Sequence, residues 1–240
     1  MALAARELFS LQHASTFSRG GSMGLPEYER IAGLRASRRL LASTILPGIE
    51  ENAATGEVAA LYDHFRTHFG RPEVPGILKC FATHPSLLRH MMNLSESLLF
   101  ADGHLTRRHK EMIATAVSAQ NKCPYCADSH GYFLRVHGGS VDALCAIQAN
   151  DLLSPAFTIP EQVLLRFAQK VNLRSHEISR ADVEEMHQAG WSDPQIAETV
   201  HVAALFATFN RVANAFGLES QELLIQFEES SSSAKSGDSS

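Results

Sequence analysis

The sequence lacks a long hydrophobic run, an excess of positive charge and a dense set of cysteines. Its longest apolar stretch, residues 200–209, is interrupted by His201 and Thr208 and is too short to span a bilayer. Its net charge is −5, with basic residues spread among acids, so no basic surface for nucleic acid is evident. These absences predict a soluble protein that has neither a membrane nor a nucleic acid as its partner.

The chain has only four cysteines, and its N-terminus lacks the apolar leader of a secreted protein. Both features favour a reducing compartment, and we expect a cytoplasmic protein. Residues 9–25 contain arginine and serine but no acid, so a mitochondrial transit peptide is the alternative. We expect a loosely ordered N-terminal extension over 1–45, one helical domain over 46–228 and a disordered Ser-rich tail over 229–240.

Helical patterns run through almost the whole domain, and no alternating strand pattern is evident. Capping residues, prolines in first turns and glycines after last turns mark the helix ends. The chain is therefore predicted to be all-α, with helices over 55–69, 85–101, 106–120, 124–136, 140–150, 160–171, 179–189, 192–216 and 220–227.

A degenerate internal repeat is suggested by aligning residues 105–131 with residues 191–217 without gaps. Two helix pairs related by a pseudo-twofold axis would explain this alignment. Because the identity between the two segments is low, a chance alignment is the alternative.

The strongest chemical signal lies between Glu111 and His130. Cys123 and Cys126 are separated by Pro124 and Tyr125, at the predicted start of a helix. Sulfurs at this spacing come within reach of a disulfide, and a helix N-terminus lowers the pKa of a thiol. His130 follows Cys126 by one turn, so the two side chains share a face and the imidazole can accept the thiol proton.

Glu111 lies on the preceding predicted helix. If the two helices fold back on each other, its carboxylate reaches the start of the next helix beside Cys123 and can take a proton from that thiol. Two alternatives stay open for the cysteine pair, namely half of a zinc site and inert packing. We interpret Cys80 and Cys145 as core residues, and His201 as a core or pocket-lining histidine.

These residues resemble the alkylhydroperoxidase D-like, carboxymuconolactone decarboxylase-related family, and within it the peroxidase-related branch. The motif is Glu111, eleven residues, Cys123-Pro124-Tyr125-Cys126, three residues and His130. Residues 197–218 also look like that branch, and the resemblance covers residues 46–218.

The resemblance implies an all-helical fold of antiparallel hairpins in a homo-oligomer such as a trimer or hexamer. It implies peroxide reduction by a cysteine pair without metal, haem or flavin. Carried over, Cys126 would be the peroxidatic cysteine, Cys123 its resolving partner, and Glu111 with His130 the proton relay. This chain departs from the founding peroxidases at Tyr125, where they carry a histidine.

We therefore expect a thiol-dependent peroxidase that reduces hydrogen or organic hydroperoxides. Its reductant would be a thioredoxin-like or lipoyl-bearing protein. One alternative is a protein disulfide exchange oxidoreductase with little peroxidase activity, which Tyr125 favours because a phenol is a poor base. The other is a non-catalytic, oligomeric stress-regulatory protein with unreactive cysteines.

Overall fold

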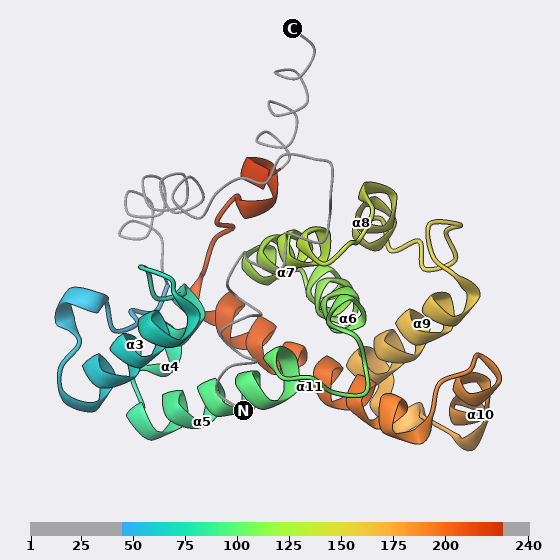
Figure 1. Cartoon of the computed structure of the whole chain (residues 1–240), viewed down its shortest axis with the longest axis horizontal. Coiled ribbons are helices and arrows are strands. Elements are labelled where there is room, and N and C mark those ends of the chain that lie inside the picture. The colour runs from blue at the N-terminus through green and yellow to red at the C-terminus, as the bar shows by residue number, and fades with distance from the viewer. Residues whose placement is uncertain (1–44, 228–240) are drawn as a thin grey trace, which may run out of the picture. The chain divides into compact units, whose positions relative to one another are not determined.

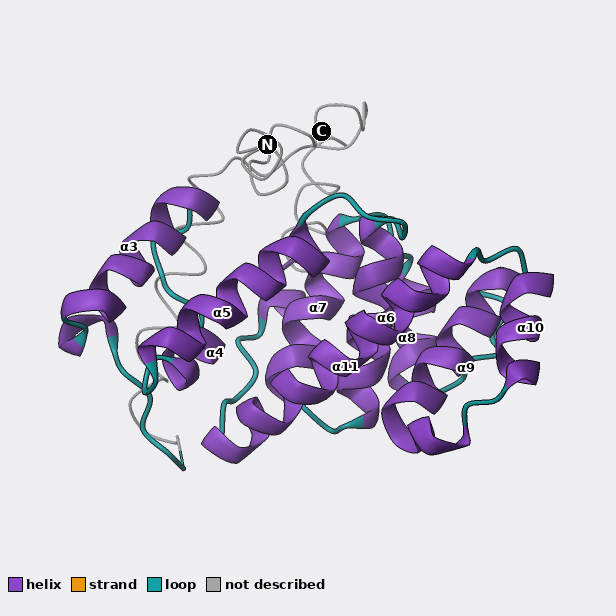
Figure 2. Cartoon of the chain, turned by 90° about the horizontal axis from the view of Figure 1, so that it is seen from below, coloured by secondary structure: helices purple, strands orange, loops and turns teal. Residues whose placement is uncertain are grey.

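The structure is a computed structural model, and it describes residues 45–227. Within that range the chain is helical and contains no strand, as Figure 2 shows. The all-α prediction is therefore confirmed. The predicted tail over 229–240 and all but the last residue of the predicted extension over 1–45 lie outside the described residues. In the described part of the chain, no helix combines the length and the apolar character needed to cross a membrane.

The chain divides into two compact units, Met1–Ala101 with Ala215–Ser240, and Asp102–Asn214. The described helices of the first unit are η2 (Glu51–Ala53), α3 (Gly56–Phe69), α4 (Gly76–Phe81), α5 (Pro85–Ser95) and its π-helical continuation η3 (Glu96–Phe100). A further short helix of this unit spans residues 223–227, inside the predicted range 220–227. The second unit contains α6 (Arg107–Gln120), α7 (Pro124–Val136), α8 (Val141–Gln148), α9 (Ile159–Arg174), η4 (Ser175–Glu177), α10 (Arg180–Gln188) and most of α11 (Asp193–Phe216), as labelled in Figure 1.

The helix boundaries follow from local chemistry. The Thr106 hydroxyl accepts a hydrogen bond from the His109 N–H at 3.3 Å, and Ser140 accepts one from Ala143 at 3.0 Å, which starts α6 and α8. Thr158 forms a capping box at the start of α9. Gly70 adopts a positive φ of 64°, which ends α3 as its position predicted.

One packed core holds the site-bearing hairpin of the second unit. Apolar side chains of α6 and α7 meet those of α8, α9 and the segment between them, where burial is the main stabilising term. The members of this core are Met112, Ala116, Leu134, Ala143, Ala146, Ile147, Leu152, Phe157 and Leu165. Packing on several elements fixes α6 and α7 against each other, so side chains on their facing surfaces have defined positions.

A buried ion pair joins α6 to α11. Lys110 Nζ lies 2.8 Å from Glu198 Oε1, while Glu198 Oε2 accepts the N–H groups of His104 at 2.7 Å and Leu105 at 2.6 Å. A Cβ atom on Gly103 would lie 2.1 Å from Glu198 Oε1. We call these residues the Glu198 clamp; they fix the segment that leads into α6.

The predicted internal repeat does not extend to a second helix pair. Residues 105–131 form the hairpin of α6 and α7, with a turn between the two helices. In the aligned segment, α11 is a single helix of 24 residues that runs through the position of that turn. The alignment therefore reflects shared helical patterning and no second hairpin.

Candidate functional site

The turn between α6 and α7 positions the cysteine pair. Lys122 takes a left-handed conformation with φ of 51°, which reverses the chain. The N–H of Cys123 then donates to the carbonyl of Ser118 at 3.0 Å. Cys123 is the N-cap residue of α7, and Pro124 occupies the first turn, where its missing N–H costs no hydrogen bond.

Both sulfurs are free thiols in a buried setting, since Cys123 is 1% exposed and Cys126 is 3% exposed. A hydrogen bond from the Cys126 side chain lowers the pKa of Cys123. Burial opposes this effect, whereas the backbone N–H of Cys126, the Asn210 amide and the backbone N–H of Tyr125 add to it. The pKa of Cys123 is thus lower than that of an ordinary thiol, which agrees with its position at a helix N-terminus.

His130 and Glu111 form a hydrogen-bonded pair across the hairpin. Nδ1 of His130 lies 2.7 Å from Oε2 of Glu111, whose side chain is completely buried. The second carboxylate oxygen of Glu111 accepts a hydrogen bond from Nε of Arg107 at 2.6 Å. Burial alone would raise the pKa of Glu111, but the charges and hydrogen bonds of Arg107 and His130 hold it below its ordinary value. Glu111 is therefore a carboxylate that accepts from His130 Nδ1, which leaves Nε2 as the basic nitrogen.

The carboxylate of Glu111 hydrogen-bonds His130, with which the resemblance paired it, and its proton transfer from Cys123 stays a prediction. Among the described residues, its side-chain partners are Arg107 and His130. The interactions that lower the pKa of Cys123 involve Cys126, Asn210 and the backbone N–H of Tyr125.

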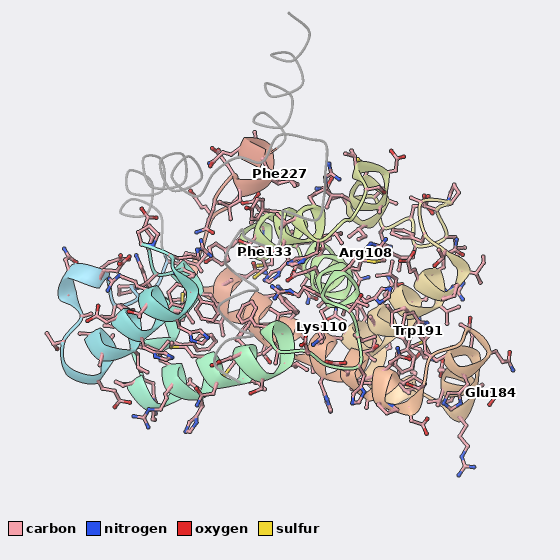
Figure 3. The ribbon with its side chains drawn as sticks, viewed as in Figure 1. Arg108, Lys110, Phe133, Glu184, Trp191 and Phe227 are labelled. Carbon is pink, nitrogen blue, oxygen red and sulfur yellow. The ribbon has the colours of Figure 1, made fainter. Side chains whose placement is uncertain are left out.

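Aromatic rings enclose the imidazole. The ring of Phe206 from α11 meets that of His130 edge-on, with 4.4 Å between centroids. The ring centroid of Phe133, a residue of α7 labelled in Figure 3, lies 5.9 Å from that of His130. The Cζ atom of Arg107 lies over the same ring, 6.0 Å from its centroid. The side chain of His130 keeps 14% exposure, so it connects the buried Glu111 to the surface.

Three site residues were not foreseen. Arg107 precedes Glu111 by four residues, a helical spacing that could have revealed the pair. His137, the C-cap residue of α7, follows His130 by two turns. Burial and the charge of Arg107 lower its pKa, and the charge of Glu111 opposes them. Asn210 comes from α11, and no sequence spacing connects it to the cysteines.

The remaining titratable candidates lie elsewhere. Cys80 is buried in the first unit, as predicted, and burial raises its pKa to about 12. The core interpretation of Cys145 was wrong, because this residue lies on the exposed face of α8. His201 is likewise exposed on α11 and not a core residue. Within residues 45–227, no three His, Cys, Asp or Glu side chains gather to hold a metal ion.

Comparison with known proteins relates this hairpin to a family of enzymes. Residues 85–170 match the model of the carboxymuconolactone decarboxylase family. An alkyl hydroperoxide reductase of Mycobacterium tuberculosis is 37% identical over 97 residues, which is 40% of this chain and 27% of that protein. The chain thus matches about a quarter of the length of this curated relative.

Solved structures extend the similarity over the described helices. The alkylhydroperoxidase AhpD core of an uncharacterized peroxidase-related protein from Ralstonia eutropha JMP134 is 28% identical, with a TM-score of 0.66 over 74% of this chain and 92% of that one. The debrominase Bmp8 is 14% identical, with a TM-score of 0.62 over 78% of this chain and 98% of its own, and shows the fold alone. Over residues 85–170 the chain is therefore similar to the carboxymuconolactone decarboxylase family, and its described helices have the alkylhydroperoxidase D-like fold.

Proposed function

We propose that the protein is a thiol-dependent peroxidase that reduces hydrogen or organic hydroperoxides through Cys123 and Cys126. The observation that carries this proposal is the 2.7 Å hydrogen bond between Glu111 and His130, one helical turn from Cys126. It supplies a base of defined tautomer beside a pair of free, buried thiols. Peroxidase-related relatives with the same fold support it.

In the proposed first half-reaction, His130 accepts the Cys126 proton through Nε2. The thiolate attacks the nearer peroxide oxygen, so an S–O bond forms and the O–O bond breaks. The leaving alkoxide or hydroxide takes the proton from His130 and departs as an alcohol or water. Cys126 is oxidised to a sulfenic acid. Glu111, held as a carboxylate by Arg107, stabilises the imidazolium that forms between these steps.

In the second half-reaction, the Cys123 thiolate attacks the sulfenic sulfur of Cys126. The disulfide forms, the S–O bond breaks, and hydroxide leaves as water after taking a proton. A thioredoxin-like or lipoyl-bearing protein then reduces the disulfide through a mixed disulfide. We also propose a homo-oligomer, a trimer or hexamer, which sedimentation equilibrium would test.

A second candidate function is disulfide exchange between proteins. Tyr125 favours it, because a phenol before Cys126 is a poor base and would slow peroxide reduction.

Stopped-flow mixing of the reduced protein with hydrogen peroxide and an organic hydroperoxide tests the proposal. Mass spectrometry then follows the peptide that contains Cys123 and Cys126. We expect rapid disulfide formation, none in Cys126→Ser, and a trapped sulfenic acid with a single turnover in Cys123→Ser. Cys145→Ser is the matched control, because this exposed cysteine lies outside the site.

Normal turnover in both site variants would overturn the peroxidase proposal. Slow oxidation by either peroxide, together with rapid oxidation by a protein disulfide, would replace it with the exchange function. Unreactive thiols in the folded protein would favour the non-catalytic alternative.

A further inference from the structure

A cluster of amide side chains surrounds the turn that carries Cys123. Asn121 in the turn exchanges two hydrogen bonds with Asn172 of α9, at 3.0 and 3.1 Å. Nδ2 of Asn121 also donates to Oδ1 of Asn210 on α11 at 3.0 Å, and Asn214 donates to the Asn121 carbonyl at 3.1 Å. The cluster ties the turn to α9 and α11.

Asn210 differs from the others because it also reaches the sulfur site. It is completely buried, and its Nδ2 donates to the hydroxyl of Ser118 at 3.0 Å. The carbonyl of Ser118 accepts the N–H of Cys123 at 3.0 Å, so Asn210 and Cys123 converge on one residue of α6. An asparagine amide has two N–H donors. One donor serves Ser118, and the interaction of the amide with Cys123 lowers the pKa of that thiol, which favours the thiolate.

The buried surroundings of Cys123 increase the importance of the Asn210 donor. The largest effect on the pKa of Cys123 comes from the Cys126 thiol of α7, while Ser118 from α6 and Asn210 from α11 are uncharged. Hydrogen bonds to a charged acceptor are about twice as strong as neutral ones. In a buried site, a thiolate without such donors would bear the full cost of desolvation.

We propose that Asn210 is a positioning residue that presents Cys123 as a thiolate for its attack on oxidised Cys126. This role deepens the proposed peroxidase function and rests on it for the identity of the oxidised partner. In the step concerned, the Cys123–Cys126 bond forms, the S–O bond of the sulfenic acid breaks, and the hydroxide is protonated to water. The Asn210 amide keeps both N–H bonds and transfers no proton.

The test measures the alkylation rate of Cys123 by iodoacetamide against pH, with peptide mass spectrometry and in a Cys126→Ser background. Asn210→Leu, which is close in size but has no donor, should move the midpoint upward by about one pH unit, a roughly tenfold smaller thiolate fraction at neutral pH. Asn210→Asp, which keeps the shape and adds a negative charge, should move it further. Asn214→Leu is the matched control on the same helix and should leave the midpoint unchanged, since Asn214 bonds the turn and not the sulfur.

An unshifted midpoint in folded Asn210→Leu or Asn210→Asp would overturn the proposal, as would an equal shift in Asn214→Leu. If Asn210→Leu does not fold, Asn210→Asp decides the question alone. With Cys126 intact, Asn210→Leu should lengthen the dimedone-trappable life of the sulfenic acid about tenfold. A shifted midpoint without any sulfenic acid would uphold the Asn210 contact while overturning the peroxidase function, because alkylation needs no peroxide.

Discussion

Arg107 determines the charge state of the Glu111–His130 pair. Its Nε lies 2.6 Å from a carboxylate that has no exposure to water. Because burial raises the pKa of Glu111 and the positive partners lower it, removing Arg107 leaves burial to dominate. A side chain that transfers no proton thus decides whether the imidazole has an anion to orient it.

We expect Arg107→Met to lower the free energy of unfolding by about 3 kcal/mol near pH 7, because it leaves a buried charge without its main partner. In the wild type, the folded pKa of Glu111 lies below its ordinary value of 4.5. The stabilisation is therefore complete above that value and is lost as the pH falls through the folded pKa. The difference between variant and wild type should shrink toward acid pH, which urea unfolding at several pH values would measure.

Arg166→Met is the control, since the pair between Arg166 and Glu185 is largely exposed. It should change stability by less than about 1 kcal/mol. Equal losses in the two variants, or a loss in Arg107→Met that does not depend on pH, would contradict this account of Glu111.

Four site residues could be predicted from their spacing in the sequence. Cys123, Cys126 and His130 lie within eight consecutive residues on one helix start, so periodicity relates their side chains. Glu111 required the assumption of a hairpin, and its pairing with His130, which the resemblance implied, agrees with the 2.7 Å hydrogen bond between them. Asn210 was out of reach, because its contact with the turn spans 89 residues of chain and depends on tertiary packing.

At the scale of elements, the α6–α7 turn stores backbone strain at Lys122. A left-handed conformation costs a residue with a Cβ atom about 1 kcal/mol, and glycine adopts it freely. The φ of Lys122 is 51°. This strain lies one residue before the cysteine pair.

We expect Lys122→Gly to be more stable than Lys122→Ala by about 1 kcal/mol, because alanine keeps the strain and loses only the lysine side chain. Thermal unfolding followed by circular dichroism would measure the difference. Stability that is higher in Lys122→Ala would show that the turn carries no such strain.

Capping residues made most elements predictable. The predicted ends of the helices over 124–136 and 192–216 lie within one residue of those of α7 and α11. By contrast, α4 was missed because six residues give too little periodicity, and α9 extends to Arg174, beyond the predicted end at 171. The π-helical turn of η3 depends on packing that local sequence does not encode.

At the scale of the whole molecule, every candidate site residue lies within the unit Asp102–Asn214. Hydrogen bonds and ring contacts from α6, α7, α9 and α11 complete the site inside that unit. The thiol chemistry proposed for the protein therefore draws its groups from one compact part of the chain.

Removal of residues 1–44 should accordingly leave the rate of disulfide formation by hydrogen peroxide unchanged. Stopped-flow comparison of the full chain with a variant that begins at Ile45 would measure this. A large loss of rate in a folded variant would mean that the N-terminal residues contribute to the site.

The Glu198 clamp also constrains how this sequence can diverge. Its carboxylate serves Lys110 and two backbone N–H groups at once, in a space that any Cβ atom on Gly103 would enter. Replacing either Lys110 or Glu198 alone would leave the other as a buried charge without its partner, which is strongly destabilising. Positions 103, 110 and 198 should therefore covary in descendants of this chain, exchanged together for an apolar set or retained together.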